Sequence, residues 1–148
     1  KIERKGYNET NSQKYRDALC DFCMTFGQPE RATHAFQLSL DELPYSVPHW
    51  NGLAKSYLAQ NEIENAHEAI DFALAIEENN AEALEVKGFC YIQNENYEEA
   101  LRIYHQLLPT SKVPSRIYAL MVKCYMDMEK ANEAKATCHY QSSQPPHV

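Results

Sequence analysis

The stretch GFCYIQNENYEEA, residues 88–100, recurs in outline at a fixed interval along this 148-residue chain. Thirty-four residues earlier, residues 54–66 read AKSYLAQNEIENA, and thirty-four residues later, residues 122–134 read VKCYMDMEKANEA. In each copy an apolar block ends at a polar break and a second block follows. A repeat with a period of about 20 to 50 residues is typical of repeat architectures, so this period decides how the chain is divided.

Alanine gives the register of the repeat. The alanines that lie thirty-four residues apart are Ala32, Ala66, Ala100 and Ala134. They divide the chain into four windows, residues 13–46, 47–80, 81–114 and 115–148. Twelve positions before each alanine the residue is mostly small, and these residues are Cys20, Ala54, Gly88 and Val122. Nine positions before it a tyrosine recurs, and these residues are Cys23, Tyr57, Tyr91 and Tyr125.

Each window predicts a helix, a short turn and an antiparallel helix. The apolar residues follow helical spacing in two blocks, and the polar breaks FGQPE, QNE, NEN and MEK separate the blocks. Gly27, Asn61 and Asn94 tolerate the left-handed conformation at a helix end, so we expect the turns there. Small residues let the two helices cross closely, and aromatic residues fill the space beside the crossing. A single hairpin cannot bury its own apolar face, so the hairpins are predicted to stack into a solenoid.

These positions resemble the tetratricopeptide repeat family, whose pattern is Trp, Leu, Gly, Tyr, then Ala, Phe, Ala, Pro. The second window carries Trp50, Leu53, Ala54, Tyr57, Ala66, Ile70 and Ala73. The third window carries Leu84, Gly88, Tyr91, Ala100 and Tyr104. The resemblance implies an all-α fold, a right-handed α-solenoid with three clear repeats and one degenerate N-terminal repeat over residues 13–142. Residues 1–12 have no period and are expected to form a mobile arm, and residues 143–148 a polar tail.

Composition limits the classes of partner. The formal net charge is −7 and no Lys/Arg cluster occurs, which disfavours nucleic acid. No apolar run approaches the length of a membrane span, so we expect no membrane insertion. The five cysteines do not have the number or spacing of a disulfide framework, which favours a reducing compartment. We therefore expect an intracellular, cytoplasmic chain.

No motif in the sequence indicates catalysis. Cys20 and Cys23 form a C-x-x-C, but zinc needs two further ligands and a redox pair usually opens a helix beside a strand. Both cysteines fall at packing positions of the repeat, so core packing explains them better. Nucleophile, phosphate-loop and metalloprotease motifs are missing from the sequence. We predict a protein that is not an enzyme, with neither catalytic residues nor a cofactor or metal site.

The family resemblance implies that partners bind the concave surface that the first helices of the hairpins line. Carried over by repeat position, the predicted partner-binding residues are Met24, Asn51, Lys55, Leu58, Glu85, Val86, Phe89, Ile92, Arg116, Leu120, Lys123 and Met126. Many are apolar, so the expected partner is another protein, held through a peptide or an amphipathic helix. A clamp for the acidic tail of a heat-shock chaperone is disfavoured. Only Asn51, Lys55 and Arg116 fit its pattern, whereas Asp17, Asp21, Val86 and Leu120 stand where the family has Asn or basic residues.

Three roles remain open for such a module. The first is an adaptor, scaffold or chaperone that binds a partner segment in the groove. The second is a bacterial type III secretion chaperone for an export substrate or apparatus subunit, a class that the chain resembles in architecture. The third is a self-associating structural repeat segment of a larger protein, and a homodimer is left open.

Overall fold

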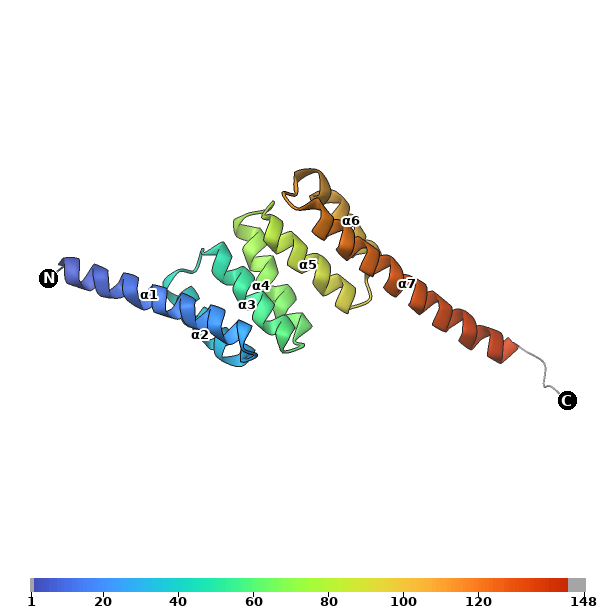
Figure 1. Cartoon of the computed structure of the whole chain (residues 1–148), viewed down its shortest axis with the longest axis horizontal. Coiled ribbons are helices and arrows are strands. Elements are labelled where there is room, and N and C mark those ends of the chain that lie inside the picture. The colour runs from blue at the N-terminus through green and yellow to red at the C-terminus, as the bar shows by residue number, and fades with distance from the viewer. Residues whose placement is uncertain (1, 144–148) are drawn as a thin grey trace.

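The computed structural model describes the backbone of residues 2–143 and the side chains of residues 13–132 and Lys135, and all regular structure in this part is helical (Figure 1). The elements are α1 Ile2–Thr25, α2 Pro29–Glu42, α3 Val47–Ala59, α4 Ile63–Ile76, α5 Ala81–Gln93, α6 Tyr97–Leu107, the 3₁₀ turn η1 Leu108–Thr110 and α7 Pro114–Ser143. None of the described helices is long and apolar enough to cross a membrane.

The helices form a single stack of antiparallel hairpins. α1 pairs with α2, α3 with α4, and α5 with α6, and each hairpin packs on the next through α2–α3, α4–α5 and α6–α7 contacts. Figure 1 shows the hairpins following one another in chain order, with the first half of α1 and the second half of α7 projecting from opposite ends of the stack. This arrangement confirms the predicted all-α solenoid.

The three hairpins share one turn. The residues with positive φ are Gly27 (72°), Asn61 (60°) and Glu95 (62°), each five positions before the repeat alanine. The backbone N–H of the residue that follows each of them bonds five residues back, at distances of 2.7 Å for Gln28 to Cys23, 2.9 Å for Glu62 to Tyr57 and 2.8 Å for Asn96 to Tyr91. This is the Schellman arrangement that ends a helix. The sequence predicted Asn94 for the third turn, but Asn94 has a φ of −90° and Glu95 adopts the left-handed conformation.

Replacing Glu95 with glycine is expected to stabilise the protein by about 1 kcal/mol, because an L-residue pays a steric cost in the left-handed region that glycine avoids. Urea unfolding followed by helical circular dichroism measures the difference. The control is Glu98→Gly, an exposed position in the first turn of α6, where glycine is expected to destabilise by about 0.5–1 kcal/mol. A loss of stability in Glu95→Gly would contradict the turn geometry.

Small residues bring the helices of each hairpin together. Cys20, Ala32, Ala54, Ala66 and Ala100 are all fully buried. In the third hairpin the buried ring of Tyr104 lies directly over Gly88, where an added Cβ would stand 2.7 Å from Cε1 and Cζ of the ring. The predicted close crossings are therefore present, with aromatic rings packed against them.

The fourth window differs from its prediction. The sequence predicted a hairpin with a turn at residues 128–130, but α7 runs as one helix of 30 residues through these positions. Met128, Glu129 and Lys130 are all strong helix formers, and no glycine or asparagine stands among them. Lys130 would also place a positive charge at the start of a second helix, where the helix dipole disfavours it.

The chain ends also differ in part from the prediction. The backbone of the expected N-terminal arm continues α1 as helix back to Ile2. The mobility of residues 1–12 stays a prediction. The boundaries of the expected polar tail were 143–148. Helix α7 includes Ser143, and residues 144–148 lie outside the described residues.

Candidate functional site

The first helices of the hairpins enclose a hollow of about 430 Å³ between α3, α5 and α7. The residues that line it, called the groove below, are Lys55, Leu58, Glu82, Glu85, Val86, Phe89, Arg116, Ala119, Leu120 and Lys123. On α5 and again on α7 the lining residues have spacings of three, four and seven, which places them on one face of each helix. The groove therefore follows from the helical repeat and joins three successive windows.

The floor of the groove is apolar. Leu58, Phe89 and Leu120 are half-buried, one from each of the three helices, and Val86 beside them is almost fully buried. Part of each of the first three side chains therefore faces solvent inside the hollow. Apolar side chains that stay accessible in a concave surface are typical of a binding site, because covering them releases water.

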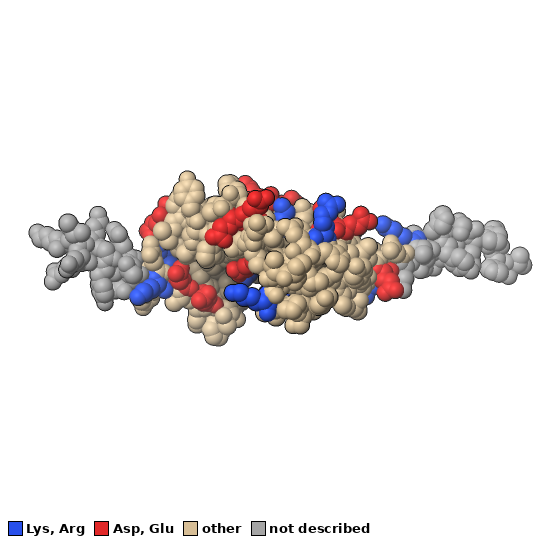
Figure 2. Space-filling view, turned by 90° about the horizontal axis from the view of Figure 1, so that it is seen from above, with Lys and Arg blue, Asp and Glu red and all other residues tan. Residues whose placement is uncertain are grey.

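Ion pairs surround this floor. Arg116 Nε lies 2.6 Å from Glu85 Oε1 in an ion pair between α7 and α5, and Lys55 Nζ pairs with the carboxylate of Glu82 across α3 and α5. Lys123 Nζ lies 3.2 Å from Asp127 Oδ2 on the same helix. Each basic side chain of the groove thus has an acidic partner. The molecular face in Figure 2 also shows basic and acidic side chains interspersed, without a field of one sign.

The comparisons with known proteins agree with this geometry. Residues 59–121 match the family model for the tetratricopeptide repeat, and most of the chain superimposes on solved tetratricopeptide domains. The chain has the fold of a tetratricopeptide-repeat solenoid. No curated protein matches it in sequence.

Three of the solved structures illustrate the similarity. The first tetratricopeptide domain of Spaghetti (RPAP3), bound to the HSP90 peptide SRMEEVD, has a TM-score of 0.72 at 15% identity, covering 79% of this chain and 95% of that chain. The Sgt2 domain of Aspergillus fumigatus has a TM-score of 0.70 at 15% identity, with 93% and 87% covered. The TPR2B domain of yeast Sti1, in a complex with pHsp70, has a TM-score of 0.71 at 14% identity, with 77% and 96% covered. These identities show a shared fold.

Most of the predicted partner-binding residues of this solenoid lie together in the groove. Those that line it are Lys55, Leu58, Glu85, Val86, Phe89, Arg116, Leu120 and Lys123. Glu82 and Ala119, at neighbouring positions of the same helix faces, complete the lining. Met24 lies outside it, in an adjoining hollow of about 380 Å³ that also includes Asp17 and Asp21.

Besides Met24, three predicted residues do not line the groove. Ile92 is buried in the core cluster with Leu101 and Ile103, so its assignment to the groove is wrong. Asn51 is buried and its Nδ2 donates to Asn80 Oδ1 at 3.1 Å, so it fastens α3 to the start of α5. Met126 is exposed on α7 but is not among the lining residues.

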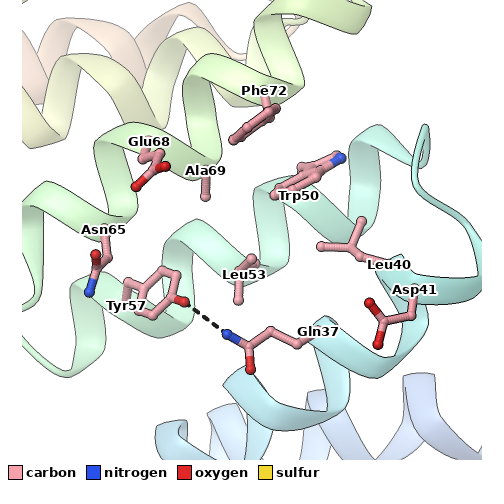
Figure 3. A pocket seen from close by; sticks show the side chains of 10 residues that line it. All are labelled: Gln37, Leu40, Asp41, Trp50, Leu53, Tyr57, Asn65, Glu68, Ala69 and Phe72. Carbon is pink, nitrogen blue, oxygen red and sulfur yellow. Dashed lines mark hydrogen bonds between the residues drawn. The ribbon is translucent and has the colours of Figure 1, made fainter.

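A second hollow of about 290 Å³ lies between α2, α3 and α4, away from the groove residues (Figure 3). Trp50 stacks on Phe72 with ring centroids 4.7 Å apart and the planes inclined by 17°. Gln37 Nε2 donates to the hydroxyl of Tyr57 at 3.0 Å. Trp50 and Tyr57 thus fill the space beside the helix crossing, as the repeat predicts.

The described cysteines are buried side chains of the core. Cys20, Cys23, Cys90 and Cys124 are free and buried. Burial raises the pKa of the Cys20 thiol to about 11 and that of Cys90 to about 12, and it also raises the pKa of Cys124. Such thiols do not supply thiolate at neutral pH. Among the described residues, no group of three His, Cys, Asp or Glu side chains is placed to hold a metal ion.

The raised thiol pKa values predict a loss of stability in alkaline solution. The pKa of the Cys90 thiol is 9.0 in the unfolded chain and about 12 in the folded protein. Between these pH values the folded protein keeps the thiol proton, whereas the unfolded chain releases it. Its contribution to stability is complete below pH 9.0 and is lost as the pH rises toward about 12. We expect wild type to lose more unfolding free energy over this window than Cys90→Ala. The prediction would be contradicted if urea titrations at successive pH values gave the same loss of unfolding free energy for wild type and for Cys90→Ala.

Proposed function

We propose that the chain is a non-catalytic protein-interaction module, and that the groove binds a peptide or amphipathic helix of another protein through apolar anchors. The observation that carries this proposal is the accessible floor of Leu58, Phe89 and Leu120, which three helices hold in one concave surface. Apolar anchors of an extended or helical segment cover such a floor, and the surrounding charges orient its polar groups. This role fits an adaptor, a scaffold or a chaperone.

The second candidate is a clamp for an acidic chain end. It draws on the structural neighbours, since the domain of Spaghetti is bound to an HSP90 peptide and that of yeast Sti1 is in a complex with pHsp70. In this chain the pairing of Arg116 with Glu85 and of Lys55 with Glu82 works against a clamp. An incoming carboxylate would have to displace these partners and then remain close to like charges, which costs affinity. We therefore favour apolar anchoring.

The finer roles stay proposals. A type III secretion chaperone would use the same groove for an apolar segment of its export substrate, and this proposal rests on the likeness of architecture. A cytoplasmic location is likewise an expectation from the cysteine pattern. A self-associating repeat would use a surface outside the groove.

A peptide-display selection tests the proposed function. The library holds random peptides of about a dozen residues, long enough to lie along a groove of this kind, in one format with free C-termini and one with blocked C-termini. We expect selected peptides to carry spaced apolar residues and to bind equally well in both formats. The peptide SRMEEVD serves as the clamp probe and is expected to bind no better than its scrambled version. Enrichment of acidic peptides that need a free C-terminus would support the clamp instead.

A further inference from the structure

One face of α7 is apolar and exposed although its neighbouring face is buried. Ile117, Met121 and Cys124 are buried in a core cluster with residues of α6. One position further along in each case, Tyr118 is 55% exposed, Val122 55% and Tyr125 52%. These three residues, called the α7 stripe below, have spacings of four and seven and therefore form a continuous strip on the helix.

The same repeat positions are covered in the other hairpins. On α3 they are Trp50, Ala54 and Tyr57, and on α5 they are Leu84, Gly88 and Tyr91. Trp50 stacks on Phe72 of α4, Ala54 is fully buried, and Gly88 lies beneath Tyr104 of α6. At its first two positions this strip therefore contacts the second helix of the same hairpin. The tyrosine at the third position contacts the second helix of the preceding hairpin, Tyr57 through Gln37 of α2 and Tyr91 through His67 of α4. In the fourth window the second helix, residues 131–143, continues straight on as part of α7.

Residues 131–143 keep the sequence pattern of a second helix. Ala131, Ala134 and Cys138 occupy the repeat positions of Tyr97, Ala100 and Tyr104. The antiparallel register of the third hairpin would set Ala131 opposite Tyr125, Ala134 opposite Val122, and Cys138 opposite Tyr118. Each large residue of the α7 stripe would then meet a small residue, a combination that packs without voids or overlap.

We propose that the α7 stripe is covered by residues 131–143 of a second copy of this chain. In this dimer the two α7 helices lie antiparallel and cross near Met128. Each copy then contributes its residues 131–143 to the fourth hairpin of the other copy. Such an exchange makes a closed dimer in which the same contact occurs twice. Figure 1 shows that α7 already projects from the stack in the extended form that the exchange requires.

The hinge favours the second copy over folding back. In the closed hairpins the left-handed residue is glycine, asparagine, or a glutamate between Asn94 and Asn96. The equivalent Glu129 stands between Met128 and Lys130, which favour a continuous helix. A straight α7 avoids the strained turn, and an exchanged segment still buries the stripe. The proposal is independent of the groove, whose α7 residues are Arg116, Ala119, Leu120 and Lys123.

Light scattering after size exclusion tests the dimer. We expect the 148-residue chain to elute with twice its mass of 17.1 kDa. Val122→Glu combined with Tyr125→Glu should raise the dimer dissociation constant by about 100-fold, while the helical circular dichroism stays the same. The control is Phe22→Glu, which changes an aromatic side chain of α1 that is 53% exposed and should leave the dimer intact.

Disulfide trapping tests the register and distinguishes exchange from folding back. Cys138 is first replaced by alanine, and the buried cysteines remain because they are not accessible. One chain then carries Val122→Cys and another Ala134→Cys. Exchange predicts a disulfide-linked dimer when the two chains are mixed and oxidised, and little when either is oxidised alone. A chain that carries both changes should give intermolecular bonds.

Two further results decide the proposal. Glu129→Gly with Lys130→Asp supplies the missing turn residues and is expected to shift the protein toward monomer with an intramolecular 122–134 disulfide. A wild-type chain that stays monomeric at all concentrations would overturn the proposal. An intramolecular disulfide in the chain that carries Val122→Cys and Ala134→Cys, without the turn substitutions, would also overturn the proposal.

Discussion

Ala100→Leu is expected to destabilise the protein by about 1–3 kcal/mol, because it overpacks the close crossing of α5 and α6. Ala100 is fully buried in the third hairpin, in the same core cluster as Tyr104, whose ring lies over Gly88 of the facing helix. The larger side chain must push α5 and α6 apart and disturb the cluster that also packs against α7. Urea unfolding followed by circular dichroism at neutral pH gives the change in free energy.

Ala75→Leu is the matched control for this substitution. Ala75 is an exposed residue of α4, so the same change should alter stability by less than about 0.5 kcal/mol. If Ala100→Leu were as mild as Ala75→Leu, the register that places Ala100 at the crossing would be contradicted.

Leu58→Glu combined with Phe89→Glu is expected to weaken peptide capture by about 100-fold or more. Both side chains are half-buried in the apolar floor of the groove, from α3 and α5. A bound apolar anchor would have to desolvate the two introduced carboxylates without a counter-charge, since Lys55 and Arg116 are already paired. Fluorescence anisotropy with a display-selected peptide measures the loss, and circular dichroism checks that the variant is folded.

The control for the groove variant uses exposed aromatic residues elsewhere. Tyr15 is 83% exposed and Tyr45 is 80% exposed, and neither lines the groove. Tyr15→Glu with Tyr45→Glu adds the same charge and should leave peptide affinity within about 2-fold of wild type. Retained affinity in a folded groove variant, or an equal loss in this control, would place the binding surface elsewhere.

The sequence predicts this fold well because the repeat is carried by packing residues. The alanines at the crossings and the aromatic rings beside them are required for two helices to approach, so their spacing reports the hairpin directly. The predicted position of the left-handed residue in the third turn was less exact. Asn94 is the better residue for a left-handed conformation, yet Glu95 adopts it, because the constant spacing between the helices fixes the turn at one repeat position.

The errors at the site and at the C-terminal end have different causes. Ile92 and Phe89 lie almost one helical turn apart, and only the packing of α6 and α7 decides that Ile92 is buried while Phe89 faces the groove. The fourth window keeps the core pattern of the repeat but lacks turn residues, so periodicity predicted a hairpin where local helix propensity gives a continuous α7. The ion pairs Lys55–Glu82 and Arg116–Glu85 join residues of different windows, and no pattern along one helix indicates them.

NMR chemical-shift mapping with a display-selected peptide tests the groove assignment most directly. Titration of the labelled protein is expected to perturb the signals of Leu58, Val86, Phe89 and Leu120 first, and to leave those around Trp50 and Phe72 unchanged. Perturbations centred on the hollow between α2, α3 and α4, or on the N-terminal end of α1, would contradict the assignment of the groove as the binding site.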